Sequence, residues 1–479
     1  MSKSTVTIFW FRRDLRLHDN HGLYRALAEA GDVLPLFIFD KEILDGLSDD
    51  DPRVTFIHHT LTQIKATLNS LGSDLIVEFG TPLDVWTSLL KKYNIKAAYT
   101  NHDYEPYAKS RDESIADLLR SHEIHLNTYK DHVIWEKEEV LSKAGTVYTV
   151  FTPYKRRWLE LWHEHYVKSA PKSGTYFPSE KHESAFAKMR KSRMISLGEM
   201  SFVASQLSIP SATVAQGVIK NYGERRNFPG LDDSTSKLGI HFRFGTISIR
   251  QKAFKAMRLS DVFLSELIWR DFYAQILANF PHVVGEAFRA KYDRIPWREN
   301  EEEFQLWCEG KTGYPIVDAG MRELNATGYM HNRVRMITAS FLTKHLLMDW
   351  RRGEAYFATK LLDFDLASNN GGWQWASGSG TDAAPYFRIF NPTSQMDKFD
   401  KERTYIMKWV PEYETDDYPP PIVDHKFARE RCLTTYKTAL NQIFMVYYRF
   451  GQDYRHTYHR TRHRRHHARL VRSTVRSII

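Results

Sequence analysis

The sequence predicts an α/β N-terminal domain built on a parallel sheet, followed by an all-α C-terminal domain. Two observations support this fold class. Over residues 5 to about 130, short apolar segments alternate with helical segments, an order typical of a parallel sheet covered by helices on both faces. From about residue 201 to residue 440, the apolar residues recur with helical periodicity, interrupted by loops. A chain of 479 residues is long enough for two or three domains.

Five strands are expected in the first 130 residues, with helices between them. The strands are Val6–Phe11, Val33–Phe39, Leu75–Glu78, Ala97–Thr100 and His125–Tyr129. The helices are Pro52–Leu71, Pro82–Tyr93 and Pro106–Ser121. Proline suits the first turn of a helix because the N–H group that it lacks would have no partner there. The sheet should be Rossmann-like, but no GxGxxG sequence follows the first strand, so a standard dinucleotide site is not expected.

The chain is predicted to divide into an α/β domain (1–130), a connector (131–200), a helical domain (201–440) and a tail (441–479). Within the connector, Lys168–Arg193 has the Lys, Ser, His and Pro content of a long surface loop. The tail alternates arginine and histidine with few apolar residues, so we expect it to be disordered. A nucleic-acid tether, a solvated extension and an artefact of the reading frame are all open for it.

Composition excludes several classes of protein. No apolar run is long enough to cross a bilayer, and Thr5–Phe11 runs directly into Arg12, so it is a strand and not a signal peptide. Two cysteines, Cys308 and Cys432, exclude a disulfide scaffold and a multi-cysteine metal site, and they fit a reducing cytoplasm. Of the net charge of +9, residues 441–479 contribute +8 through nine arginines and one aspartate. DNA binding by the remaining residues must therefore depend on a local patch.

The region from Leu362 to Pro392 has an unusual composition. Acids, amides, glycines and large aromatic residues are concentrated there, above all in the stretch NNGGWQW at Asn369–Trp375. A fold does not require this mixture at this density. It suits a site that holds a flat, polar, redox-active ring.

Four segments resemble the signature motifs of the photolyase/cryptochrome flavoproteins, most closely those of class I photolyases acting on cyclobutane pyrimidine dimers. The segments are Glu266–Tyr273, Trp307–Pro315, Thr327–Met336 and Asn369–Pro392. They occur in the order of the family, and the resemblance extends from about residue 5 to about residue 440. It implies that the N-terminal domain carries an antenna chromophore and that the helical domain binds FAD and is catalytic.

The resemblance implies a U-shaped FAD whose phosphates bind near a helix start. Asp363 and Arg335 match an ion pair beneath the isoalloxazine, where a cation favours the reduced ring. Asn369 matches the residue facing N5, which is asparagine in photolyases, aspartate in plant cryptochromes and cysteine in animal ones. Gly239 departs from the family, since many members have serine there. The implied FAD-binding residues are Tyr222, Thr235, Ser236, Lys237, Leu238, Gly239, Arg335, Asp363, Phe364, Asp365 and Asn369.

The resemblance also implies a pocket for a flipped-out pyrimidine dimer, because enzymes that act on bases, photolyases among them, extrude their target from the duplex. The implied catalytic residues are Glu266, Asn332, Met336 and Asn369. Glu266 shares a helix face with Trp269. Arg333 and Arg335 lie about 200° apart around a helix, so one can reach phosphate while the other faces the flavin. The implied DNA- and lesion-binding residues are Arg226, Glu266, Trp269, Asn332, Arg333, Met336, Trp375, Arg388 and Gln395.

Two further functions follow from the resemblance alone. Trp297, Trp350 and Trp373 match the three-tryptophan relay that reduces the flavin from the protein surface. In the antenna motif, Tyr104–Tyr107 is followed by Ala108, where folate-binding relatives have an acid. The identity of a second chromophore is therefore unknown, and folate, a deazaflavin, a flavin and an empty pocket all stay open.

The sequence thus predicts deoxyribodipyrimidine photo-lyase activity, a carbon–carbon lyase reaction. Blue light would drive an electron from reduced FAD to the flipped-out dimer. We expect a cytoplasmic monomer that binds damaged DNA and uses neither a membrane nor a metal. One alternative is a cryptochrome photoreceptor that signals through the tail. Another is a flavin reductase, which would need a nicotinamide site, and the sequence contains no sign of one.

Overall fold

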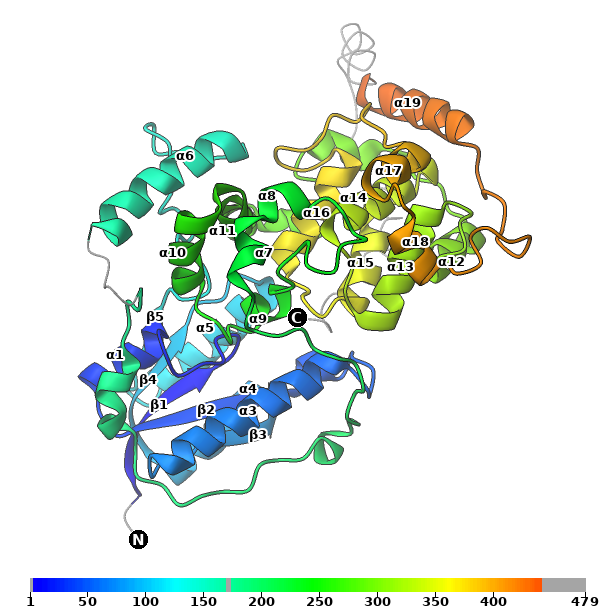
Figure 1. The fold of residues 1–479 in the computed structure, drawn as a ribbon. Coiled ribbons are helices and arrows are strands. Elements are labelled where there is room, and N and C mark those ends of the chain that lie inside the picture. The colour runs from blue at the N-terminus through cyan, green and yellow to red at the C-terminus, as the bar shows by residue number, and fades with distance from the viewer. Residues whose placement is uncertain (1–2, 169–173, 442–479) are drawn as a thin grey trace, which may run out of the picture. The chain divides into compact units, whose positions relative to one another are not determined.

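The computed structural model describes residues 3–168 and 174–441, which form two compact units (Figure 1). Unit 1 comprises the described residues of 3–220 together with 236–279. Unit 2 comprises residues 221–235 and 280–441. The prediction of a disordered tail concerns residues that, apart from Asn441, lie outside the described part of the chain.

Unit 1 contains a five-stranded sheet in the order β3-β2-β1-β4-β5, and its neighbouring strands are all parallel, which confirms the predicted sheet. The strands are β1 (Thr5–Phe11), β2 (Val33–Asp40), β3 (Ile76–Gly80), β4 (Asn94–Asn101) and β5 (Leu126–Tyr129). Side chains of the central strand alternate between two apolar cores: Phe9 and Phe11 join one, and Ile8 and Trp10 join the other.

Helices cover both faces of this sheet. They are α1 (His21–Glu29), α2 (Lys41–Leu44), α3 (Pro52–Ser70), α4 (Pro82–Lys92) and α5 (Pro106–Arg120). Leu23 of α1 and Leu61 of α3 pack in the core that contains Phe9, whereas Trp86 of α4 packs in the core on the opposite face. The helices predicted to begin at proline do so. Asn20 caps α1 by accepting a hydrogen bond from the Leu23 N–H at 3.2 Å.

The rest of unit 1 is mainly helical and loop structure. Its elements are α6 (Phe151–Trp162), the π-helix η1 (His163–Val167), the 3-10 helices η2 (Ser179–Ala185) and η3 (Gly198–Met200), α7 (Gln216–Lys220), α9 (Gly239–Arg243), α10 (Ile249–Leu259) and α11 (Asp261–Asn279). α6 lies within the predicted connector, and it packs against α11. Residues 168–193 were predicted to form a long loop, and the described part of that range contains one short 3-10 helix, η2.

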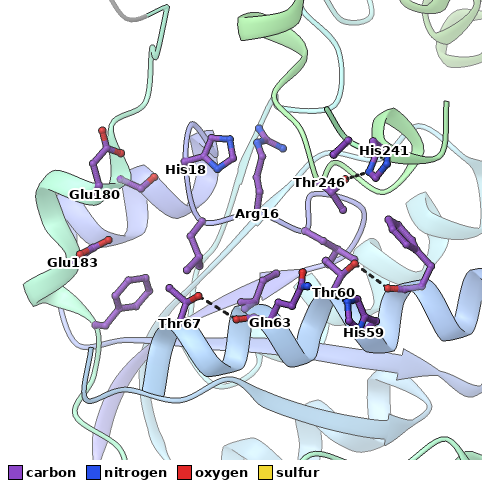
Figure 2. Close-up of a pocket in the computed structure, with 17 residues that line it drawn as sticks. Arg16, His18, His59, Thr60, Gln63, Thr67, Glu180, Glu183, His241 and Thr246 are labelled. Atoms are coloured by element: carbon purple, nitrogen blue, oxygen red, sulfur yellow. Dashed lines mark hydrogen bonds between the residues drawn. The ribbon is translucent and has the colours of Figure 1, made fainter. Parts of the chain in front are cut away.

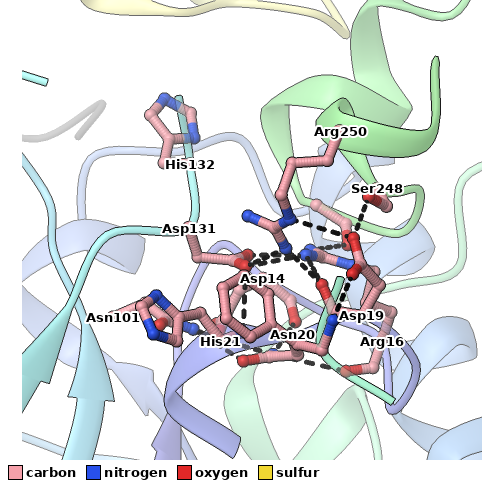
Figure 3. Close-up of polar contacts among 12 residues, drawn as sticks. Asp14, Arg16, Asp19, Asn20, His21, Asn101, Asp131, His132, Ser248 and Arg250 are labelled. Atoms are coloured by element: carbon pink, nitrogen blue, oxygen red, sulfur yellow. Dashed lines mark hydrogen bonds and ion pairs between the residues drawn. The ribbon is translucent and has the colours of Figure 1, made fainter. Parts of the chain in front are cut away.

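A buried network of charged groups ties α10 to the sheet of unit 1 (Figure 3). Asp131, just after β5, accepts hydrogen bonds from Arg16 Nη2 and Arg250 Nη2, each at 2.7 Å. Arg250 Nε also donates to Asp19 Oδ2 at 3.0 Å. Burial by itself would raise the pKa of Asp131, but the two guanidinium groups hold that pKa well below its usual range. The carboxylate is therefore charged at neutral pH and fixes both arginines.

Unit 2 is helical, which confirms the all-α prediction for the C-terminal half. Its elements are α8 (Tyr222–Arg225), η4 (Pro281–Val284), η5 (Ala290–Arg294), α12 (Glu301–Glu309), α13 (Pro315–Thr327), α14 (Asn332–Ser340), η6 (Phe341–His345), α15 (Trp350–Lys360), α16 (Leu366–Ser377), α17 (Pro392–Phe399), α18 (Thr404–Trp409) and α19 (His425–Asn441). Among the described helices of the chain, none combines the length and the hydropathy that crossing a bilayer would require.

Candidate cofactor and substrate site

An ion pair joins α14 to the segment before α16 in unit 2. Arg335 Nη2 donates to Asp363 Oδ2 at 3.0 Å, and Arg335 Nε donates to the Met330 carbonyl at 2.7 Å. Burial alone would lower the pKa of Arg335, but the Asp363 carboxylate raises it. The other carboxylate oxygen, Asp363 Oδ1, is buried and has no hydrogen-bond partner within residues 3–168 and 174–441. A buried carboxylate oxygen in this state is suited to accept a hydrogen bond from a ligand.

Asn369 is held by a glutamate that the sequence did not single out. Its Nδ2 donates to Glu354 Oε1 at 2.9 Å and to the Glu354 carbonyl at 3.1 Å. Glu354 lies on α15 and is 5% exposed. Burial raises its pKa to about 7, although the Asn369 hydrogen bond acts in the opposite direction. Because the amide nitrogen is bound to Glu354, the amide oxygen of Asn369 is left to accept from a donor elsewhere.

Helix α16 positions both Asn369 and the predicted electron carrier Trp373. Its N-cap is Asp365, whose Oδ1 accepts the Ser368 N–H at 3.1 Å. Trp373, four residues after Asn369, lies on the same side of the helix and is buried. Trp375 is half-buried. The predicted acid Asp365 therefore has a structural function at the start of the helix that carries the other residues.

The ring of Trp373 packs against α15 and α12. Its centroid is 4.9 Å from that of Phe357 and 6.0 Å from that of Trp307, and both contacts are edge-on. Trp307 is fully buried, and its Nε1 donates to the Thr338 carbonyl at 3.2 Å. Trp350, the first residue of α15, is also buried, whereas the half-buried Trp297 contacts Tyr436 at 5.9 Å. Trp307 stands in one of the recognisable motifs, but its spacing gave no sign of this contact.

Gly353 makes the approach of α15 to Trp373 possible. A Cβ atom on Gly353 would lie 2.1 Å from Trp373 Cη2 and 2.6 Å from Leu342 Cδ2. Such distances are far below van der Waals contact, so any larger residue must displace the indole or the helix.

We expect Gly353→Ala to lower the rate of light-driven reduction of the bound flavin by about tenfold, since displacing Trp373 raises the barrier by about 1.4 kcal/mol. The measurement is the loss of oxidised-flavin absorbance under blue light with an external reductant. Gly372→Ala is the matched control, because no atom lies within 4 Å of the Cβ position at Gly372. Equal rates for the two variants would show that the close approach has no bearing on electron delivery.

Two arginines of unit 2, Arg226 and Arg388, lie close enough to a third, Arg333, to act on it electrostatically. Arg333 Nη2 donates to Asn227 Oδ1 at 2.7 Å, and its guanidinium lies 4.4 Å from the ring centre of Phe399. Burial lowers the pKa of Arg333, and the nearby charges of Arg226 and Arg388 lower it further. Such a cluster of like charges, which we call the arginine cluster, is suited to bind an anion such as a phosphate.

The predicted site residues are divided between the two units. Unit 1 carries Ser236, Lys237, Leu238, Gly239, Glu266 and Trp269. Unit 2 carries Tyr222, Arg226, Thr235, Trp297, Asn332, Arg333, Arg335, Met336, Trp350, Asp363, Phe364, Asp365, Asn369, Trp373, Trp375, Arg388 and Gln395. Glu266 and Trp269 lie one turn apart on α11, as expected. Thr235 Oγ1 lies 2.8 Å from the Tyr329 hydroxyl, and Lys237 has a left-handed backbone with φ of 51°.

A cavity of about 470 Å³ lies in unit 1 beside α3 (Figure 2). Leu15, Phe56 and Ile64 are among its apolar walls, and His59 and Glu180 are among its polar lining. The antenna motif at Tyr104–Ala108 does not line it. In that motif, Glu105 accepts from Arg13 at 2.7 Å and from Arg243 at 2.8 Å. Glu105 is therefore bonded within the protein by two arginines.

Two family models match the chain. The model described as DNA photolyase matches residues 7–173, and the model described as the FAD binding domain of DNA photolyase matches residues 263–416. Among curated proteins, the deoxyribodipyrimidine photo-lyase of Halobacterium salinarum is 36% identical over 487 residues, covering 91% of this chain and 99% of the relative.

The chain is also similar to solved photolyase structures. A class III photolyase from Agrobacterium tumefaciens superposes with a TM-score of 0.77 at 31% identity, covering 92% of this chain and 98% of that one. An archaeal photolyase from Sulfolobus tokodaii, solved with two FAD molecules, superposes with a TM-score of 0.75 at 34% identity, covering 90% and 99%. Its second FAD was taken to imply a novel light-harvesting cofactor.

Proposed function

Because the chain belongs to the DNA photolyase family, we propose that it is a deoxyribodipyrimidine photo-lyase that repairs cyclobutane pyrimidine dimers in DNA under blue light. The main support for this proposal is that α14 carries two arginines with different surroundings, Arg333 and Arg335. Arg335 pairs with Asp363, whose second carboxylate oxygen has no hydrogen-bond partner within the described residues. Arg333 belongs to the arginine cluster. One helix thus joins a cofactor site to an anion site.

FAD is the cofactor, and the chain fits it. Asp363 Oδ1 and the amide oxygen of Asn369 offer acceptors for ring N–H groups, and Arg335 supplies a positive charge close to them. When bound and reduced, FAD supplies an electron on excitation by blue light. The residues proposed to hold it are Tyr222, Thr235, Ser236, Lys237, Leu238, Gly239, Arg335, Asp363, Phe364, Asp365 and Asn369.

The lesion that we propose for this chain is the cyclobutane pyrimidine dimer. Met336 matches a residue typical of enzymes that act on this lesion, and Asn369 matches the asparagine typical of photolyases. We propose class I from the resemblance of the four motifs; the solved relatives include a class III photolyase. We propose that Trp269 and Trp375 stack on the dimer, since indole rings bind flat bases through their faces. Glu266 and Asn332 would then donate or accept hydrogen bonds at the pyrimidine edges. We also propose a cytoplasmic location, which fits two cysteines that are free and buried, and a monomeric state.

The test uses reduced protein and two oligonucleotides, one with a cyclobutane thymine dimer and one with a six-four photoproduct. We expect the cyclobutane dimer to be converted to thymines under blue light but not in the dark, and the six-four photoproduct to persist. Conversion in the dark, or conversion of neither lesion, would contradict the proposed activity. Conversion of the six-four photoproduct alone would contradict the dimer class.

The arginine cluster makes a separate prediction about DNA affinity. Arg333→Met should weaken binding to any DNA sequence by about 1 kcal/mol, roughly fivefold in Kd, and should reduce the slope of log K against log salt by about one. Titrations with labelled duplex DNA at several salt concentrations measure both quantities. Arg120→Met is the matched control, because Arg120 is an exposed arginine of unit 1 paired with Asp117. Identical salt slopes for all three proteins would exclude a phosphate contact at Arg333.

A further inference from the structure

Trp269 is itself stacked on another aromatic residue. Its ring is nearly parallel to that of Phe151, with an interplanar angle of 6° and centroids 3.7 Å apart. Phe151 is 8% exposed, and Trp269 is half-buried. Phe272 meets the indole edge-on at 5.5 Å. Phe151 therefore covers one face of Trp269, so a flat ligand can stack only on the opposite face.

Helix α6, whose first residue is Phe151, is fixed to α11, which carries Trp269. On one side, Lys155 Nζ donates to Ser265 Oγ at 2.6 Å. Further along α6, Trp158 Nε1 donates to the buried carboxylate of Asp271 at 2.9 Å. Both bonds join the same two helices, so α6 cannot move away from α11 without breaking them. The start of α6, and with it Phe151, is therefore held beside Trp269.

We propose that Phe151 is a positioning residue for lesion binding: it sets the plane of Trp269 and leaves a single face of the indole for the pyrimidine dimer. The inference rests on the proposed function, since it takes Trp269 to stack on the dimer. A ring that is already held in its bound orientation need not be ordered when the lesion enters, and this lowers the entropic cost of binding. The structure thereby assigns α6, in the predicted connector, a function at the substrate site.

The test compares the dark binding of reduced holoenzyme to two duplexes of one sequence, one of which contains a thymine dimer. Phe151→Leu keeps an apolar side chain but removes the flat face against Trp269. We expect the Kd for the dimer duplex to rise about three- to tenfold, the range that a lost aromatic pair gives. The Kd for the undamaged duplex should not change.

Tyr154→Phe is the matched control on α6. It removes a buried hydroxyl that has no hydrogen-bond partner in the part of the chain that the structure describes, and both Kd values should stay as in the wild type. FAD content and the midpoint of urea unfolding confirm that each variant is folded.

A double-mutant cycle separates positioning from general packing. If Phe151 acts through Trp269, Phe151→Leu should have no further effect on the Kd for the dimer duplex in a Trp269→Ala background. A full additional effect in that background, or equal losses for dimer and undamaged DNA, would overturn the inference while leaving the proposed function intact. A wild-type protein that does not distinguish the two duplexes would instead overturn the proposed function, and this inference with it.

Discussion

Replacing Trp373 with phenylalanine should slow the light-driven reduction of bound, oxidised FAD by at least about a hundredfold, which corresponds to about 2.7 kcal/mol on the barrier. Trp373 is 2% exposed and follows Asn369 by one helical turn. Phenylalanine fills most of the same space, but its ring is much harder to oxidise than an indole. The rate is read from the loss of oxidised-flavin absorbance under blue light. Repair by chemically reduced Trp373→Phe should match the wild type, because the relay only loads the flavin.

A control at a distant tryptophan and substitutions along the predicted relay show which indoles carry the electron to the flavin. Trp86→Phe replaces a fully buried indole of unit 1 in the core beside Trp10 and should leave photoreduction unchanged. Along the predicted relay, Trp350→Phe should reproduce the loss seen for Trp373→Phe, whereas Trp307→Phe should not. The reverse result would move the path to Trp307, whose ring contacts Trp373 at 6.0 Å.

The fold was largely predictable because its sheet and helix starts depend on local signals. Proline at the first turn predicted the first residue of α3, α4 and α5 correctly, and each predicted end lay one residue beyond the observed one. The ends of the strands were predicted less well. β4 was predicted to begin at Ala97, but it begins at Asn94. Thr5 pairs with Asn94 in the backbone ladder, although the Asn94 side chain is exposed and breaks the apolar pattern. Backbone pairing does not depend on apolar side chains, so periodicity misses it.

The sequence predicted contacts within the site only between residues that both belong to recognised motifs. Arg335 and Asp363 were expected to pair, and they are in contact. Glu354 was not noticed, since a glutamate in a helix is most often exposed, and its burial depends on how α15 packs on α16. Phe151 was missed for the same reason, because it lies more than one hundred residues before Trp269 in a segment predicted to be a connector. Tertiary packing places both residues, and no local pattern encodes it.

Glu354 should make the stability of the protein depend on pH. Because burial raises its pKa to about 7, the folded protein binds more protons than the unfolded chain between pH 4.5 and 7. The contribution of Glu354 to the free energy of unfolding therefore falls as pH rises through this window and levels off above it. Glu354→Gln cannot lose a proton, so its free energy of unfolding relative to the wild type should increase by about 3 kcal/mol from below to above the window. Urea unfolding at several pH values measures the difference.

Exposed Glu302 on α12 provides the control for Glu354, and Glu302→Gln should differ from the wild type by less than about 0.5 kcal/mol at every pH. Parallel stability curves for Glu354→Gln and the wild type would mean that Glu354 titrates at its ordinary pKa and is not desolvated.

Glu354 should also influence the reduction potential of the bound flavin, because its Oε1 accepts a hydrogen bond from the amide nitrogen of Asn369. Glu354→Leu removes that side-chain acceptor and leaves only the carbonyl of residue 354 to hold the amide nitrogen, so the direction of the Asn369 oxygen is less firmly fixed. The reduced flavin should then be harder to form, which a lowered reduction potential of the holoenzyme would report, whereas Glu354→Gln keeps an amide oxygen there and should shift the potential less.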